Sequence, residues 1–211
     1  MLAGVASFFI RSSGCNLRCR WCDTPYTSWL PEGERRSVRD LVAEAEASPA
    51  AHVVVTGGEP LLQREIGPLT RQLGEVGLHV TVETAGTVAP DFRCDLLSVS
   101  PKTANSDPQG GWRGRHRARR RDLEPLKRLL ARHGDFQLKF VVQDSDDVPE
   151  ILTLLDSLGD VPRDRVVLMP EGRTPAELEA RGPEVASLCI QHGFRYTPRL
   201  QLDLFGGGRG V

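Results

Sequence analysis

Short apolar runs alternate along the chain with longer segments in which apolar residues recur at helical spacing. The short runs are rich in Val, Ile, Leu and Phe and are nearly continuous, which is typical of strands buried on both faces of a parallel sheet. They predict six strands, at 6–10, 52–56, 79–83, 96–100, 137–142 and 166–169.

Helical patterns fill the segments between these strands. Ser37 stands where a helix needs a capping side chain, and Thr174 opens the sequence pattern of a capping box. Pro68 is expected to break or kink the helix in which it lies. The predicted helices are 37–47, 62–76, 122–132, 148–158 and 174–191.

Repeated strand–helix units predict right-handed crossovers and a parallel sheet. Six such units are too few to close an eight-stranded barrel. We therefore expect an α/β fold with a partial β/α barrel of about six parallel strands. The chain has 211 residues, of which 39% are hydrophobic, and no linker interrupts it, so 1–211 is expected to form a single domain. The stretch 103–121 is rich in Gly, Asp, Pro and Arg and is expected to be a mobile basic loop.

The charge balance gives no reason to expect binding to nucleic acid or to an anionic membrane. The formal net charge is −1, so no strong overall field acts on such partners. No apolar run is long enough to span a bilayer. The first thirteen residues lack the charged start and the cleavage site of a signal peptide. We therefore expect a cytoplasmic protein.

Three of the five cysteines fall within eight residues, at Cys15, Cys19 and Cys22. Their C-x3-C-x2-C spacing follows the first predicted strand directly. Three thiolates on one loop can bind three irons of a cubane cluster and leave the fourth iron open for another ligand. Structural zinc is the alternative, but it requires a fourth ligand, and the nearest histidine is His52. Cys94 and the remaining cysteine have apolar neighbours and are interpreted as core residues.

The cysteine loop, with Trp21 before its last cysteine, resembles the radical S-adenosylmethionine (SAM) superfamily. Further blocks narrow the resemblance to the 7-carboxy-7-deazaguanine synthase family. These blocks are GCNLRCRWCDT at 14–24, TGGEP at 56–60, VETAGT at 82–87, SPK at 100–102, LMPEG at 168–172 and the C-terminal RL…GGGRG. The resemblance extends from Val5 to the end of the chain, and it implies a partial barrel of the radical SAM type.

The resemblance also implies a reaction. Members of this family convert 6-carboxy-5,6,7,8-tetrahydropterin into 7-carboxy-7-deazaguanine and release ammonia, in 7-deazapurine biosynthesis of the queuosine type. The implied cofactors are a [4Fe–4S] cluster, SAM and Mg²⁺. The implied partners are the small pterin substrate, an external one-electron reductant of the flavodoxin or ferredoxin type, and a second copy of the chain in a homodimer.

Site residues follow from the same motifs. The resemblance implies that Cys15, Cys19 and Cys22 hold the cluster. It also implies that the Thr24 hydroxyl binds Mg²⁺ with Asp23 beside it. The residues implied to contact SAM are Trp21, Asp23, Gly57, Gly58, Glu59, Ser100, Lys102, Met169, Pro170 and Glu171. The residues implied to contact the substrate are Arg11, Thr56, Gln201 and Val211.

Two features depart from the family pattern. The family usually begins with a further strand and a QGEG-type loop that binds the pterin, whereas Met1 lies just after that point, so we expect the true start to lie upstream. Gln201 stands where the family often has histidine. Glutamine can form hydrogen bonds there but does not titrate near neutral pH.

Two other functions compete with this interpretation. One is a different radical SAM enzyme, such as a glycyl-radical activase, which would share the cysteines and TGGEP but bind a protein. The other is a zinc-stabilised RNA-binding module that uses the basic run RGRHRARRR at 113–121. That run contains no aromatic residue for stacking on bases, and a nucleic-acid role is therefore not expected.

Overall fold

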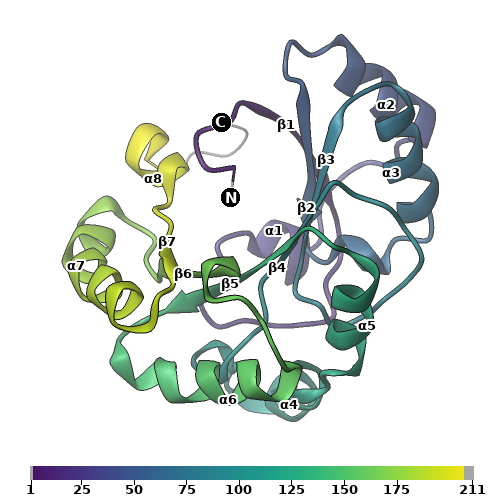
Figure 1. The fold of residues 1–211 in the computed structure, drawn as a ribbon. Helices are drawn as coiled ribbons and strands as arrows, with labels where there is room; N and C mark the ends of the chain where they lie inside the picture. Colours follow the sequence, from purple (N-terminus) through teal and green to yellow (C-terminus); the bar gives the residue numbers. More distant parts are fainter. Residues whose placement is uncertain (1, 207–211) are drawn as a thin grey trace.

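Each strand pairs in parallel with the strand that follows it in the chain, so the sheet has the order β1-β2-β3-β4-β5-β6-β7. The computed structural model describes residues 2–206. Figure 1 shows the strands following one another around a curved sheet whose edges are β1 and β7. The strands are β1 (Ser7–Ser12), β2 (His52–Gly57), β3 (His79–Thr84), β4 (Leu96–Val99), β5 (Phe136–Val142), β6 (Val166–Pro170) and β7 (Arg195–Tyr196).

The longer helices lie around the outside of this sheet (Figure 1). The α-helices are α1 (Pro25–Ser28), α2 (Val38–Ala47), α3 (Ile66–Glu75), α4 (Arg113–Arg121), α5 (Glu124–Arg132), α6 (Val148–Leu158), α7 (Pro175–His192) and α8 (Leu200–Phe205). Short 3-10 helices are η1 (Pro60–Leu62), η2 (Ala104–Ser106), η3 (Gly110–Trp112), η4 (Ser145–Asp147) and η5 (Arg163–Arg165). Across residues 2–206, no helix combines the length and the apolar character needed to cross a membrane.

The partial β/α barrel predicted from the sequence is confirmed, and all six predicted strands are present. The seventh strand was not predicted because β7 has only two residues, both of them exposed, and carries no apolar run. Ser37 caps α2 by accepting a hydrogen bond from the amide of Asp40. Pro68 lies in the first turn of α3. Amide groups in that turn have no acceptor within the helix, so the helix is not broken by the lack of an N–H group at Pro68.

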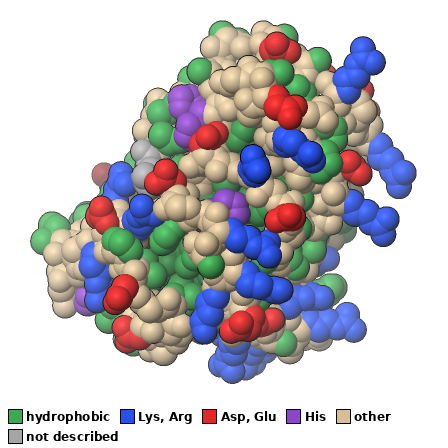
Figure 2. All heavy atoms as spheres, turned by 45° about the vertical axis from the view of Figure 1, so that its right-hand side comes forward, with side chains coloured by type: hydrophobic (Ala, Val, Ile, Leu, Met, Phe, Trp, Pro, Cys, Tyr) green, Lys and Arg blue, Asp and Glu red, His purple; other side chains and the backbone are tan. Residues whose placement is uncertain are grey.

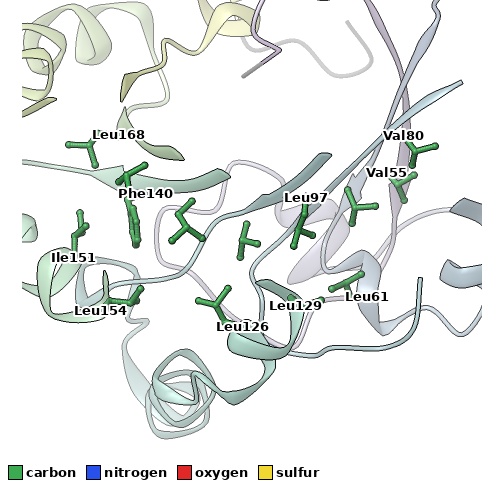
Figure 3. Packing of buried hydrophobic residues seen from close by; sticks show 14 of the residues in the cluster. Val55, Leu61, Val80, Leu97, Leu126, Leu129, Phe140, Ile151, Leu154 and Leu168 are labelled. Atoms are coloured by element: carbon green, nitrogen blue, oxygen red, sulfur yellow. The ribbon is translucent and has the colours of Figure 1, made fainter. Parts of the chain in front are cut away.

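The core lies between the outer face of the sheet and the helices. Figure 3 shows Leu97, Phe140 and Leu168 from the strands facing helical side chains such as Leu126 and Ile151. Full burial of side chains of this size stabilises the fold by about 1.5–3 kcal/mol each relative to exposure. The strand positions between these apolar residues point to the inner face, and several are polar. They include Thr56, Glu83, Ser98, Gln137 and Lys139.

The segment 103–121 is not the loop that the sequence predicted, because it contains η2, η3 and the nine-residue helix α4. The buried face of α4 is formed by His116 and Arg120, which lie one helical turn apart. Arg120 donates to Asp107 at 2.7 Å and to Glu150 at 2.6 Å. Prediction from apolar spacing fails here because the side chains that hold this helix in place are polar.

Candidate active site

The three clustered cysteines lie on the loop that follows β1, at the carboxyl edge of the sheet. The amide of Leu17 donates to Cys15 Sγ at 3.4 Å, and the amide of Cys22 donates to the carbonyl of Cys19 at 3.2 Å. The Leu17 side chain is fully buried and anchors the loop. Burial raises the pKa of the Cys15 thiol and raises that of Cys19 to about 12. Metal binding must therefore displace protons from these thiols.

This donor set suits an iron–sulfur cluster. Cys15, Cys19 and Cys22 present three thiols from one tight loop. Besides burial, Cys15 and Cys22 both raise the pKa of Cys19, and Cys22 raises the pKa of Cys15, as closely spaced negative charges do. In the described part of the chain, no three His, Cys, Asp or Glu side chains converge on a single metal ion. A cubane does not require such convergence, because each thiolate binds a different iron. The residues therefore fit the cluster that the spacing predicted.

The TGGEP turn packs directly beneath the cysteine loop. A Cβ atom on Gly58 would lie 2.3 Å from the carbonyl oxygen of Gly14 and 2.5 Å from that of Thr27. The amide of Gly58 donates to the Ser12 carbonyl at 3.0 Å, and the next amide donates to the Gly14 carbonyl at 2.9 Å. Gly57 has a φ of +124°, a conformation that favours glycine. The two glycines therefore let the second strand-end turn approach the first.

Glu59 was predicted to contact SAM, but its carboxylate is buried inside the protein. One oxygen accepts from the Thr84 hydroxyl at 2.7 Å and from the Leu61 amide at 3.1 Å, and the other accepts from the Ala85 amide at 2.8 Å. Burial raises the pKa of this carboxyl. The Glu59 side chain thus joins the turn after β2 to the end of β3.

The SPK motif places a cation beside the cysteines. Lys102 Nζ donates to the carbonyl and to the hydroxyl of Ser100, both at 2.7 Å. The same ammonium lies 5.5 Å from the centre of the Trp21 ring, whose indole N–H donates to Asn105 at 3.1 Å. Its positive charge lowers the pKa of Cys19, against the larger effect of burial. Trp21, Ser100 and Lys102, all predicted SAM contacts, therefore lie together.

The CDT motif is joined to the C-terminal part of the chain. Asp23 forms an ion pair with Arg199, and Arg199 also donates to the Gly172 carbonyl at 2.6 Å. Thr24 precedes α1, and its hydroxyl makes no capping bond to that helix. The hydroxyl lies 3.9 Å from Cys22 Sγ. A hard oxygen donor is thus held beside the cysteine loop.

The end of β6 carries three further predicted SAM contacts. Pro170 is buried and Met169 is half-buried. The Glu171 carboxylate is held by Arg181, which donates to it at 2.6 Å, so its charge is balanced within the protein. A cavity of about 310 Å³ lies beyond this strand and is lined by Pro170 and Arg199 among others.

Polar side chains meet on the inner face of the sheet. Lys139 Nζ lies 3.1 Å from Glu83 Oε1, and the Thr56 hydroxyl donates to the other Glu83 oxygen at 3.2 Å. The lysine charge lowers the pKa of Glu83, and Arg11, opposite Thr56 in the strand register, acts in the same direction. Arg11 and Thr56 were predicted to contact the substrate. Gln201 lies exposed in α8, and Val211 lies outside the described residues.

The segment before and within α4 holds the backbone on both sides of Cys19. The amide of Arg18 donates to His116 Nδ1 at 3.1 Å, and the amide of Arg20 donates to the Ser106 carbonyl at 3.0 Å. Since Nδ1 is an acceptor, Nε2 carries the proton and donates to the Ser106 hydroxyl at 2.9 Å. Burial lowers the pKa of His116 to about 4, so the ring is neutral near pH 7.

Comparison with known proteins identifies the family. A model of the radical SAM superfamily matches residues 9–139. A 7-carboxy-7-deazaguanine synthase of Halobacterium salinarum is 50% identical over 97% of this chain and 84% of its own length. The same enzyme of Rhodopirellula baltica is 45% identical over 100% of this chain and 83% of its own. The chain belongs to the 7-carboxy-7-deazaguanine synthase family.

Solved structures agree with this assignment. QueE from Escherichia coli superimposes with a TM-score of 0.67 at 27% identity, over 93% of this chain and 86% of that chain. Streptococcus suis SuiB with bound S-adenosylmethionine has a TM-score of 0.63 at 15% identity, over 96% of this chain and 53% of its own, and shows the shared fold. As a member of the 7-carboxy-7-deazaguanine synthase family, the chain is a radical SAM lyase whose cofactors are a [4Fe–4S] cluster and SAM. Both competing interpretations, the glycyl-radical activase and the zinc-stabilised RNA-binding module, give way to this assignment.

Sequence reasoning missed several residues of this 7-carboxy-7-deazaguanine synthase site. Lys139 lies in the middle of an apolar strand and belongs to no motif that was recognised. His116 is hidden within the arginine run that was interpreted as a loop. Arg199 belongs to the recognised C-terminal block, but nothing in its neighbourhood indicated that it would pair with Asp23, 176 positions earlier.

Proposed function

We propose that this enzyme converts 6-carboxy-5,6,7,8-tetrahydropterin into 7-carboxy-7-deazaguanine and ammonia. The observation that carries the proposal is the CDT-bearing cysteine loop, held in place at Asp23 by Arg199 of the C-terminal block. Relatives that carry this enzyme name match over nearly the whole chain, which supports the same reaction here. The substrate and the two products balance in atoms and in electrons, so no net oxidant is consumed.

Bound cluster and SAM would supply a 5′-deoxyadenosyl radical that removes a hydrogen atom from the substrate. The chain's own contribution is to position and to shield. Cys15, Cys19 and Cys22 would hold the cluster, and the half-buried loop would limit contact with water. Lys102 and Ser100 offer a cation and a hydroxyl to the polar groups of SAM, with the indole of Trp21 beside them.

The inner face of the sheet is suited to a flat, polar heterocycle. Glu83 supplies carboxylate acceptors, while Lys139 and Arg11 supply cations that can meet a substrate carboxylate. The lowered pKa of Glu83 keeps it ionised near pH 7, so it can accept hydrogen bonds from amino and ring N–H groups. These residues would orient the pterin below the cysteine loop.

Magnesium belongs to the same proposal. The Thr24 hydroxyl is not used to cap α1 and would supply one hard oxygen ligand. The Asp23 carboxylate is held by Arg199 and would lie beside the ion. Mg²⁺ usually keeps waters and takes oxygen atoms from its substrate, so the remaining ligands would come from these sources.

We also propose that the enzyme forms a homodimer and receives electrons from an external reductant. Phe9 on the edge strand β1 is 50% exposed and Leu30 after α1 is 75% exposed, which is apolar surface that a second copy could cover. Sedimentation velocity of the reconstituted enzyme tests the dimer. A nucleic-acid partner is not proposed.

Anaerobic turnover tests the reaction. The protein is reconstituted with iron and sulfide and then mixed with SAM, a chemical reductant, Mg²⁺ and 6-carboxytetrahydropterin. We expect 7-carboxy-7-deazaguanine by mass spectrometry and a lower rate when Mg²⁺ is omitted. Release of 5′-deoxyadenosine without the deazaguanine product would contradict the proposed substrate while leaving the radical chemistry intact.

A further inference from the structure

Arginine side chains border the cysteine loop on its exposed side. We call Arg18, Arg20, Arg115, Arg119 and Arg173 the arginine rim. Arg119 Nη1 donates to the carbonyl of Asn16 at 2.5 Å, and Arg173 Nη2 donates to the carbonyl of Arg20 at 3.1 Å. Two members of the rim flank the indole of Trp112, with guanidinium carbons 4.4 Å and 5.6 Å from the ring centre. The rim therefore belongs to the immediate surroundings of the loop that would hold the cluster.

The partners of the rim arginines in the described part of the chain are neutral, so no opposite charge offsets the rim. They are backbone carbonyl oxygens, the indole rings of Trp29 and Trp112, and the amide of Gln143. Within residues 2–206, no rim arginine has an ion-pair partner. Arg117 and Arg120 differ, since Asp107 and Glu150 neutralise them. Five unpaired cations around one loop are a local excess in a chain whose net charge is −1.

The basic side chains also gather on one part of the surface. In Figure 2, Lys and Arg side chains are concentrated along the lower edge of the molecule, the edge at which α4 lies in Figure 1. Four of the five rim residues are classed as exposed, and Arg18 is half-buried. A concentrated surface charge of this kind attracts an oppositely charged macromolecule and orients it during approach.

We propose that the arginine rim is the docking surface for a small, acidic one-electron carrier protein. This inference rests on the proposed function, because a radical SAM reaction starts only after the cluster has received an electron. The step balances simply: the carrier loses one electron, the cluster gains it, and no bond forms or breaks. A carrier docked on the rim would touch residues that contact the cluster loop directly, so the electron would have a short distance to travel.

The rim is less suited to nucleic acid. The rim arginines contact two aromatic side chains: two guanidinium groups already flank the Trp112 ring, and that of Arg18 also lies 5.9 Å from the centre of the Trp29 ring. Bases would have to displace them in order to stack, whereas an acidic protein surface needs only the exposed charges. A carrier contact of this kind is expected to be small and transient, as redox encounters usually are.

Anaerobic stopped-flow reduction of the reconstituted holoenzyme tests the proposal. The probe is a reduced acidic bacterial flavodoxin, and the cluster absorbance reports electron arrival. We expect the double variant Arg115→Gln/Arg119→Gln to lower the second-order rate by about tenfold at low ionic strength and to flatten its salt dependence. Photoreduced 5-deazariboflavin, an uncharged small reductant, should reduce the wild type and the variant at the same rate.

Control variants separate location from overall charge. Arg39→Gln/Arg71→Gln removes two exposed arginines from α2 and α3 and should leave the flavodoxin rate unchanged. Arg115→Lys/Arg119→Lys keeps the charge and should retain most of the wild-type rate, even if the glutamine variant disturbs the loop. An unchanged rate in the glutamine variant, or an equal loss in the α2 and α3 control, would overturn the proposal.

Two further results keep this test independent of the proposed reaction. Cluster reduction is read directly, so it does not depend on whether the carboxypterin is the substrate. Turnover driven by the chemical reductant reports the substrate separately. Tight binding of a tRNA or a single-stranded oligonucleotide that the glutamine variant abolishes, with the flavodoxin rate unchanged, would assign the rim to nucleic acid instead.

Discussion

Gly58 determines how closely the TGGEP turn can approach the cysteine loop. Carbonyl oxygens of Gly14 and Thr27 lie on the side where any other residue would carry its Cβ atom, at 2.3 Å and 2.5 Å from that position. Both oxygens belong to backbone that is itself held by hydrogen bonds, because the amide of Gly14 donates to Thr27 and its carbonyl accepts from Glu59. Neither can move aside without breaking a contact of the site.

Gly58→Ala should therefore be costly for such a small change. We expect the free energy of unfolding of the metal-free protein to fall by roughly 1–3 kcal/mol, with a lower iron content after reconstitution. Gly74→Ala is the matched control, because its Cβ would meet nothing within 4 Å in α3 and should stabilise by about 0.5–1 kcal/mol. Urea unfolding followed by tryptophan fluorescence measures the free energy of unfolding of both variants. Equal changes in the two variants would contradict the argument that Gly58 is needed for close packing.

At the scale of elements, α4 acts as a support for the cysteine loop. His116 and Ser106 accept hydrogen bonds from the two backbone amides that flank Cys19. Arg120 holds the helix in place through ion pairs with Asp107 and Glu150. These contacts are long-range, since Arg18 and His116 are 98 positions apart. The arrangement explains why a helix composed mainly of arginine packs against the protein at all.

His116→Ala should leave the Arg18 amide without its acceptor and loosen the loop. We expect less iron retained per chain after gel filtration, and faster alkylation of the loop cysteines in the metal-free protein. His116→Asn, whose side-chain oxygen can stand near the position of Nδ1, should recover part of both effects. Alkylation as slow as in the wild type for the alanine variant would argue that α4 does not restrain the loop.

The same histidine adds a pH dependence to stability. The unfolded chain takes up a proton at His116 near pH 6.5, whereas the folded protein does so only near pH 4. The contribution of the neutral His116 ring to the free energy of unfolding is therefore fully present above pH 6.5 and is lost as the pH falls from 6.5 towards 4. His116→Asn should make the loss of stability between pH 6.5 and pH 4 shallower.

Much of the fold was predictable from the sequence because apolar strands and capped helices follow local rules. Ser37 and Thr174 both cap helices as predicted, and the cysteine spacing identified the centre of the site. Contacts that depend on distant partners could not be found in this way. Glu59 was predicted to contact SAM, and the bonds that its carboxylate accepts from Thr84 and Ala85 could not be predicted from local sequence. The buried face of α4 is polar and gave no apolar signal.

At the scale of the whole molecule, an ion pair joins the beginning of the barrel to its end. Asp23 follows Cys22 in the loop after β1, and Arg199 follows β7. Their contact therefore connects the two ends of an open sheet. The Arg199 side chain is 6% exposed and that of Asp23 is 49% exposed. The pair is thus partly protected from water, and it holds the CDT motif against the Gly172 carbonyl.

A double-mutant cycle measures this connection. Asp23→Asn and Arg199→Met should each destabilise the protein, and the double variant should be less destabilised than the sum, with a coupling of about 0.5–3 kcal/mol. Urea unfolding of the four metal-free proteins gives the coupling. Strict additivity would indicate that the two side chains do not interact in solution.

The sequential strand order has a consequence for synthesis on the ribosome. Each new strand can add to the edge left by the one before it, so the sheet can grow as the chain emerges. The cysteines emerge early, but His116 arrives some hundred residues later and Arg199 later still. During most of translation the three thiols therefore lie on a loop without its final restraints. The contacts that restrain the cysteine loop are accordingly complete only after β7 and Arg199 have been made.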